Sequence, residues 1–241
     1  MKRLRVLMTR QEIPPDRLAG ATVVVLDVFL ATTTLLTIFE NGARGVYPVG
    51  TLDEAEELNR SLSEPLRGGE QGAEKVEGYD LGPFPVEYSP ESVGDREVIF
   101  VTTNGTRAIA ESASAEKVIV GCLRNAPAVA RYLETSGTGS VYLVCAGSGG
   151  RFTLEDFLGA STILSHMQTD NWRLNDAAWM ALDLAGKYRE READALKRGR
   201  AGRWFDENDW RDELNFVGDV GASDLVPLVV DGKLQSATDT K

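Results

Sequence analysis

The apolar run at residues 23–26, VVVL, constrains the fold most, because four consecutive β-branched or aliphatic residues predict a strand that is buried on both faces. Strands of this kind lie in parallel sheets that helices cover on both sides. Asp27 follows the run at once, and an ionised carboxylate inside a buried strand is costly unless it is paired or bound to a metal ion. We therefore expect Asp27 at the C-terminal end of the strand, where a ligand can reach it.

The same order of strand, polar turn and helix repeats along the chain. Strands are expected at residues 4–8, 22–28, 45–49, 97–101, 117–121 and 140–147. Helices are expected between them, and residues 171–200 are expected to be helical as well. A further strand pair is expected near residues 216–220 and 225–232, with a turn at Asp231 and Gly232. The alternation predicts an α/β protein whose sheet carries helices on its faces.

One long segment interrupts this order. Residues 63–96 contain glycines and prolines that argue against both helix and strand, so they are expected to form a loop, and loops of this length are usually functional or disordered. A chain of 241 residues suits one large domain or two closely packed lobes. We expect a single α/β domain over residues 1–241, with an active-site loop at about 63–96.

Charge and composition exclude several classes of partner. The net charge of −11 disfavours binding to nucleic acid and to anionic membranes, which depends on a surplus of Lys and Arg. No apolar run approaches the roughly 18–20 residues of a membrane helix. The first residues lack the apolar stretch of a secretory signal, and two cysteines without a framework indicate a reducing compartment. We expect a cytoplasmic protein without nucleic-acid or membrane partners, with a homodimer as its assembly if it associates.

Polar residues follow several of the expected strands, at the edge where α/β sheets bind ligands. Hydroxyls and free N–H groups at helix starts bind anions, phosphate above all. Each such residue could instead serve only as a helix cap, and that alternative stays open. The residues concerned are Asp27, Thr32, Thr33, Thr34, Thr102, Thr103, Asn104, Thr106, Arg124, Asn125 and Thr153.

Carboxylates accompany these groups. Mg²⁺ prefers oxygen ligands, commonly one or two carboxylates together with substrate phosphate and water. The candidate ligands are Asp27, Glu70, Glu155 and Asp156. Thr153 and Asp156 also fit a capping box, which is the alternative interpretation of Asp156.

The segment CAGSGGR at residues 145–151 supports a different mechanism. Its spacing of Cys145 and Arg151 is that of cysteine-dependent phosphatases, in which a thiolate and an arginine hold the phosphate. A helix start would lower the pKa of the thiol. Glu155 and Asp156 would, however, repel a phosphate unless a cation lay between them. The chain contains neither a nucleotide P-loop motif nor H-E-x-x-H.

Together these segments resemble the 2-phosphosulfolactate phosphatase family over about residues 20–230. DVFLATTTL is similar to the family's D-V-L-R-A-T-T-T, GEQGA and YDLGPFP match two further stretches loosely, and TTNGTRA at 102–108 is unaltered. The family's C-A-G and E-D-F segments stand at 145–147 and 155–157. The resemblance implies a three-layer α/β/α fold with a mixed, largely parallel sheet. It also implies a Mg²⁺-dependent phosphatase that releases phosphate and sulfolactate, a step toward coenzyme M.

The chain departs from the family pattern where anions would bind. Leu30 and Gln71 stand where the pattern has arginines, and Pro83 and Phe84 stand where it has Asn-Ser. The family substrate carries phosphate, sulfonate and carboxylate groups, which guanidinium groups bind well. The arginines that remain as expected anion partners are Arg67, Arg107, Arg124 and Arg151.

The leading hypothesis is Mg²⁺-assisted hydrolysis of a small anionic phosphate ester. Asp27, Asn104 and Arg107 are the expected catalytic residues, and the four carboxylates above are the expected metal ligands. Substrate contacts are expected from Thr32, Thr33, Thr102, Thr103, Arg124 and Asn125. Two alternatives remain: a non-catalytic or substrate-altered homologue that binds a phosphate or sulfonate compound, and a phosphatase that depends on Cys145.

Overall fold

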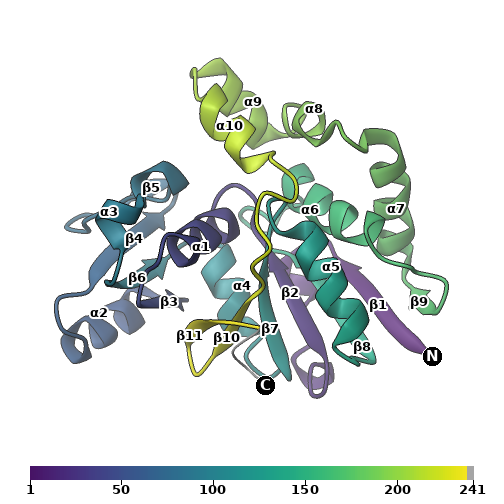
Figure 1. Ribbon diagram of the computed structural model, residues 1–241, viewed down its shortest axis with the longest axis horizontal. Helices are drawn as coiled ribbons and strands as arrows, with labels where there is room; N and C mark the ends of the chain where they lie inside the picture. Colours follow the sequence, from purple (N-terminus) through teal and green to yellow (C-terminus); the bar gives the residue numbers. More distant parts are fainter. Residues whose placement is uncertain (238–241) are drawn as a thin grey trace.

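A computed structural model, which describes residues 1–237, contains a large mixed sheet of mostly parallel strands (Figure 1). Strands β7, β2, β8, β1 and β9 run parallel to one another, while β10 pairs antiparallel with β7 and with β11. In spatial order the strands are β11 (Lys233–Ser236), β10 (Pro227–Val230), β7 (Lys117–Gly121), β2 (Thr22–Leu26), β8 (Ser140–Cys145), β1 (Lys2–Leu7) and β9 (Trp172–Leu174).

Helices cover both faces of this sheet. Val24 and Leu26 of the central strand pack in one core cluster with the first group of helices, and Val23 and Val25 pack in another with the second group. The first group is α5 (Ala126–Thr135), α6 (Leu154–Ser165) and α7 (Asp176–Tyr188), and the second is α1 (Ala31–Glu40) and α4 (Gly105–Glu111). Successive apolar residues of β2 thus face opposite sides. The predicted three-layer α/β/α fold with a mixed, largely parallel sheet is confirmed.

A second sheet lies beyond α1 and α4. Val98 and Phe100 join the core cluster that contains these two helices, while Ile99 packs on the opposite side with Ala55 of α2 (Leu52–Ser61). The sheet consists of β3 (Gly45–Val49), β6 (Glu97–Val101), β4 (Leu66–Gln71) and β5 (Glu74–Lys75), and a short helix, α3, spans Pro90–Val93. The single domain over residues 1–241 stays a prediction, and residues 238–241 lie outside the described part of the chain.

The expectation that residues 63–96 lack regular structure was wrong, because β4 lies within them. Its glycines permit close packing rather than preventing a strand. A Cβ at Gly68 would lie 2.0 Å from the Tyr88 hydroxyl oxygen, and one at Gly69, where φ is +121°, would lie 1.9 Å from the Val101 carbonyl oxygen. Only glycine lets β4 approach β6 and the Tyr88 ring this closely.

The C-terminal third also differs in part from expectation. Residues 216–220 are not a strand, because α10 (Arg211–Val217) continues into them. The turn at Asp231 and Gly232 is confirmed, since it joins β10 to β11. Helices α8 (Glu192–Leu196), α9 (Arg200–Glu207) and α10 lie above the region where the two sheets meet (Figure 1). Across residues 1–237, no helix is long and apolar enough to cross a membrane.

Candidate active site

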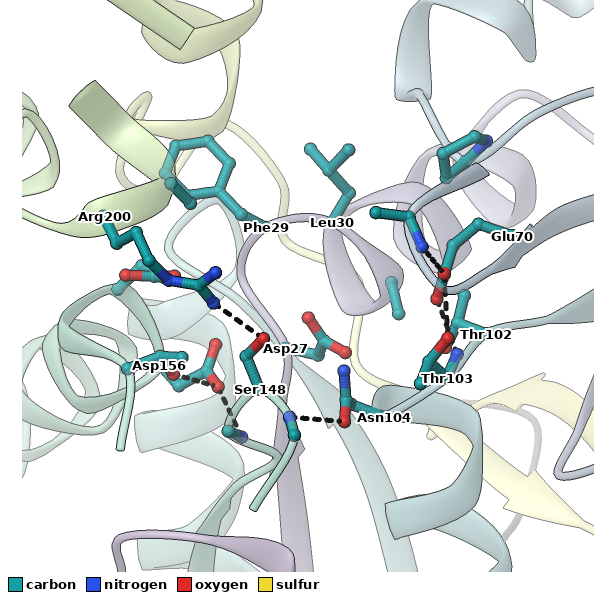
Figure 2. A pocket seen from close by; sticks show the side chains of 18 of the residues that line it. Asp27, Phe29, Leu30, Glu70, Thr102, Thr103, Asn104, Ser148, Asp156 and Arg200 are labelled. Atoms are coloured by element: carbon teal, nitrogen blue, oxygen red, sulfur yellow. Dashed lines mark hydrogen bonds between the residues drawn. The ribbon is translucent and has the colours of Figure 1, made fainter. Parts of the chain in front are cut away.

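A cavity of about 570 Å³ lies at the C-terminal ends of strands from both sheets, with α9 on its outer side. Figure 2 shows the Asp27 carboxylate near its centre, with Asp156 and Arg200 on one side and Glu70 and Thr103 on the other. The following predicted site residues line it: Asp27, Glu70, Thr102, Thr103, Asn104, Glu155 and Asp156. The ends of β2, β4, β6 and β8 therefore converge here, whereas Arg124 and Asn125, which follow β7, do not line the cavity.

Asp27 directly follows β2 and is only 8% exposed. Its position is held by Thr32, whose hydroxyl oxygen accepts a hydrogen bond from the Asp27 N–H at 3.0 Å and whose own N–H donates to the Asp27 carbonyl at 2.9 Å. The backbone of Gly105 faces the Asp27 carboxyl and lowers its pKa. Burial, and then the charges of the other three cavity carboxylates, raise the pKa of Asp27 well above its ordinary value.

Asp156 connects three segments around the cavity. Its carboxylate accepts hydrogen bonds from the Val28 N–H at 2.8 Å, the Gly147 N–H at 2.9 Å and the Thr153 hydroxyl at 2.6 Å. Burial and then the charge of Glu155 raise the pKa of Asp156 to about 7, although the three donors act in the opposite direction. The capping-box interpretation was wrong, because the Thr153 side chain donates to Asp156 and caps no helix N–H.

Glu70 ties the second sheet to the cavity. Its carboxylate accepts hydrogen bonds from the Thr103 N–H at 2.5 Å, the Thr103 hydroxyl at 2.8 Å and the Ala73 N–H at 2.7 Å. The Thr103 hydroxyl oxygen in turn accepts from the Gly72 N–H at 2.9 Å. These bonds join the turn after β4 to the segment that follows β6.

Asn104 begins α4 and directs its side-chain amide into the cavity (Figure 2). Its Oδ1 accepts a hydrogen bond from the Gly149 N–H at 3.4 Å, which leaves the amide nitrogen on the cavity side. The next residue, Gly105, has to be a glycine: a Cβ there would lie 2.7 Å from Asp27 Oδ2 and 2.6 Å from the Ala31 Cβ. The unaltered TTNG segment therefore brings an amide and a close backbone approach to the same place.

Several residues predicted to contact substrate lie away from the cavity wall. Thr32 and Thr33 are fully buried, and the Thr33 hydroxyl donates to the Val28 carbonyl at 2.9 Å. Asn125 is also fully buried, and its Oδ1 accepts from the Cys122 N–H at 2.9 Å. These side chains bond to backbone groups and do not line the cavity, which agrees with the alternative that they have a structural role.

The arginines expected to bind anions also point elsewhere. Arg107 donates to the Gly50 carbonyl at 3.3 Å, and Arg67 pairs with Glu56 at 3.2 Å. Arg124 stacks on Phe216, with its guanidinium carbon 3.8 Å from the ring centroid. The expectation that these arginines, together with Arg151, line the site was wrong, since none of them belongs to the cavity wall.

Arg200 supplies the positive charge that the sequence did not locate. Within the described chain it is the one Lys or Arg on the cavity wall. It begins α9, donates from Nη2 to the Ser148 hydroxyl oxygen at 2.8 Å, and its charge lowers the pKa of Glu155 against the larger effect of burial. Arg200 lies in a stretch, RGRAGR, that read only as part of a helical region, so its orientation could not be foreseen.

Cys145 contradicts the cysteine-phosphatase alternative. Its side chain is fully buried in the core of the large sheet and does not line the cavity. Burial, followed by the charge of Asp156, raises the pKa of the thiol well above its ordinary value. A nucleophilic cysteine needs the opposite environment, one that favours the thiolate.

Comparison with known proteins places the chain in a family. The model of the 2-phosphosulpholactate phosphatase family matches residues 7–232. The chain belongs to this family. A protein of Caldanaerobacter subterraneus subsp. tengcongensis named "Probable 2-phosphosulfolactate phosphatase" is 36% identical over 239 residues, which are 98% of this chain and 99% of that protein. A Thermotoga maritima protein of the same name is 41% identical over 160 residues, which are 66% of this chain and 67% of that protein.

The outer part of the cavity is apolar. We call this part the apolar wall. Phe29 stacks on Phe205 with ring centroids 4.8 Å apart, and Phe84 meets Phe205 edge-on at 6.2 Å. The apolar wall consists of Phe29, Leu30, Phe84, Trp204 and Phe205. Gln71, at the second altered position, is exposed and lies off the cavity wall.

Proposed function

We propose that this chain is a Mg²⁺-dependent phosphomonoester hydrolase that accepts 2-phosphosulfolactate, the ester in its family's name, and releases phosphate and sulfolactate. The observation that carries the proposal is the convergence of Asp27 with three further carboxylates, an amide and an arginine in one cavity at the sheet edge. Family membership supports the same reaction class.

The donor set suits a hard cation. Four carboxylates line one cavity, where the charges of the other three add to burial in raising the pKa of Asp27, and carboxylate oxygens are what Mg²⁺ prefers. No three acidic, histidine or cysteine side chains within residues 1–237 enclose an ion by themselves, so substrate phosphate and water would complete the shell. Asp27 is the proposed direct ligand, and Glu70, Glu155 and Asp156 would act directly or through water. When bound, Mg²⁺ would neutralise the phosphate and make an attacking water more acidic.

The protein's own groups would hold the phosphoryl oxygens. The Asn104 amide and the Arg200 guanidinium both face the cavity and can donate hydrogen bonds to an anion. The N-termini of α1 and α6 meet the cavity as well, and the positive ends of their dipoles offset part of the acidic charge. A carboxylate of the cavity would accept the proton of the attacking water.

Phosphate release from 2-phosphosulfolactate, measured with Mg²⁺ and with EDTA, tests the proposal. We expect release that requires Mg²⁺, and we expect Asp27→Asn to lower kcat by at least about a hundredfold, the usual scale for a charge that stabilises the transition state. Asp53→Asn, an exposed acid on α2, is the matched control and should leave kcat unchanged. Full activity of Asp27→Asn would refute the assignment. Thermal stabilisation by the ester without phosphate release would favour the non-catalytic alternative.

A further inference from the structure

The charge and the apolar wall of the cavity also bear on the chemical class of its substrate. We propose that the preferred substrates are phosphate monoesters whose alcohol part is apolar or aromatic, with that part bound against the apolar wall. This inference rests on the proposed phosphomonoester hydrolysis and specifies its substrate class. In the reaction, the oxygen of water forms a new bond to phosphorus, the ester P–O bond breaks, and the alcohol leaves with a proton.

The charge of the cavity favours substrates with a single anionic group over those with several. 2-Phosphosulfolactate carries a phosphate, a sulfonate and a carboxylate, whereas Arg200 is the single Lys or Arg on the wall within the described residues. Arg200 already donates to Ser148 and lies near the Glu155 charge. With one guanidinium on the wall, a substrate with a sulfonate and a carboxylate beside its phosphate finds fewer cationic partners than a substrate with a phosphate alone.

The apolar wall indicates that the alcohol part of the substrate is apolar or aromatic. Phe84 is fixed from behind by Trp210, whose ring stacks on it at 4.6 Å, and Phe29 is fixed by Phe205. Trp204 meets Phe205 edge-on at 5.3 Å and remains 48% exposed, so much of its ring surface is free for contact. Rigid aromatic groups with exposed faces bind apolar and aromatic ligands at little entropic cost.

The arrangement of the two parts gives the substrate its orientation. Figure 2 shows Phe29 and Leu30 on the far side of the cavity from Asn104, with the Asp27 carboxylate between them. A phosphate near Asp27 would therefore direct its ester group toward the apolar wall. The volume of about 570 Å³ exceeds what a three-carbon ester fills and lies in the range of pockets for larger ligands.

The test compares two esters whose leaving alcohols are similarly acidic, 2-phenylethyl phosphate and ethyl phosphate, with 2-phosphosulfolactate as a third substrate. Matching the leaving groups ensures that a difference in kcat/KM reports binding of the phenyl group and not chemical reactivity. We expect kcat/KM to be highest for 2-phenylethyl phosphate, and to exceed that for ethyl phosphate at least tenfold.

Two variants locate the contact. Trp204→Ala should lower the ratio of kcat/KM between 2-phenylethyl and ethyl phosphate about tenfold, because an aromatic face is lost. Trp179→Ala is the matched control, since Trp179 is 60% exposed on α7 and does not line the cavity, and the ratio should stay unchanged. Leu30→Arg adds a cation to the apolar wall and should shift selectivity toward 2-phosphosulfolactate by at least tenfold.

The outcomes separate this inference from the proposed function. Equal kcat/KM for the two alkyl esters, a ratio unaffected by Trp204→Ala, or a preference for 2-phosphosulfolactate would each overturn the inference while phosphomonoester hydrolysis stands. Absence of phosphate release from all three esters would overturn both. Selectivity for the phenyl ester that depends on Trp204 and not on Trp179 would establish it.

Discussion

At the scale of single residues, the site depends on how closely Gly105 approaches Asp27. The Gly105 backbone lowers the pKa of the Asp27 carboxyl, and the missing Cβ leaves space that Asp27 and Ala31 occupy. Gly105 is therefore needed so that its backbone can lie close to Asp27, whereas the residue pair Asn104-Gly105 by itself suggests only a turn. Glu70 and Asp156 differ from Asp27, because each already accepts three hydrogen bonds and thereby positions its neighbours.

We expect Gly105→Ala to lower kcat at least tenfold and to destabilise the fold by about 1–3 kcal/mol, the usual cost of overpacking. The added methyl would displace Asp27 or Ala31, since both lie under 3 Å from the new atom. Steady-state kinetics and thermal unfolding would measure the two effects. Gly186→Ala, in open space on α7, is the control and should leave activity unchanged. Unaltered kinetics of Gly105→Ala would contradict the role given to this approach.

At the scale of secondary-structure elements, α10 holds a carboxyl that its surroundings do not satisfy. Glu213 is buried, and its Oε1 has no hydrogen-bond partner. Burial, followed by the charge of Glu87, raises the pKa of Glu213 to about 7. The folded protein therefore keeps a proton on this group that the unfolded chain releases near its ordinary pKa of 4.5.

We predict that the free energy of unfolding falls as the pH rises from about 4.5 to about 7, because the unfolded state binds fewer protons than the folded state in this range. Glu213→Gln cannot ionise, so it should unfold at higher denaturant concentration than wild type at pH 8 and should lose this part of the pH dependence. Asp212→Asn, an exposed neighbour on the same helix, should change neither property. Identical pH profiles of Glu213→Gln and wild type would rule out the interpretation.

The elements also show how far local patterns reach. The residue pattern of VVVL predicts β2 and its two buried faces, and both are present. The glycines in residues 66–71 argued against a strand, yet β4 forms there because β6 and Tyr88 lie too close for any side chain. Likewise, residues 216–220 read as a strand, but Phe216 and Val217 are the last two residues of α10. In both places the packing partner, which no local pattern encodes, decides the outcome.

At the scale of the whole molecule, the C-terminal helical segment links the two sheets through aromatic contacts. Phe205 of α9 stacks on Phe29, which follows β2, and meets Phe84, which belongs to the segment after β4. The same helix begins with Arg200 on the cavity wall. Packing of α9 therefore both closes the outer side of the cavity and delivers its positive charge.

We expect Phe205→Ala to lower the free energy of unfolding by about 3 kcal/mol, as is usual when a buried aromatic ring is removed. The variant should also raise KM more than it lowers kcat, because α9 would no longer hold Arg200 and the apolar wall in place. Denaturant unfolding and steady-state kinetics would measure this. Phe152→Ala, at a half-exposed ring outside the cavity, is the comparison and should leave KM unchanged. Loss of kcat at constant KM would speak against a role of α9 in binding.

The sequence by itself determined the fold class, the family and the residues at the strand ends, because buried strands, turn glycines and segments such as TTNGTRA are local patterns. Only the tertiary structure decided which side chains meet. It turned Arg107 and Arg124 away from the cavity and brought in Arg200, which lies 173 residues after Asp27. The direction of a side chain follows from the packing of its element against distant ones, and that packing emerges only when the whole chain is folded.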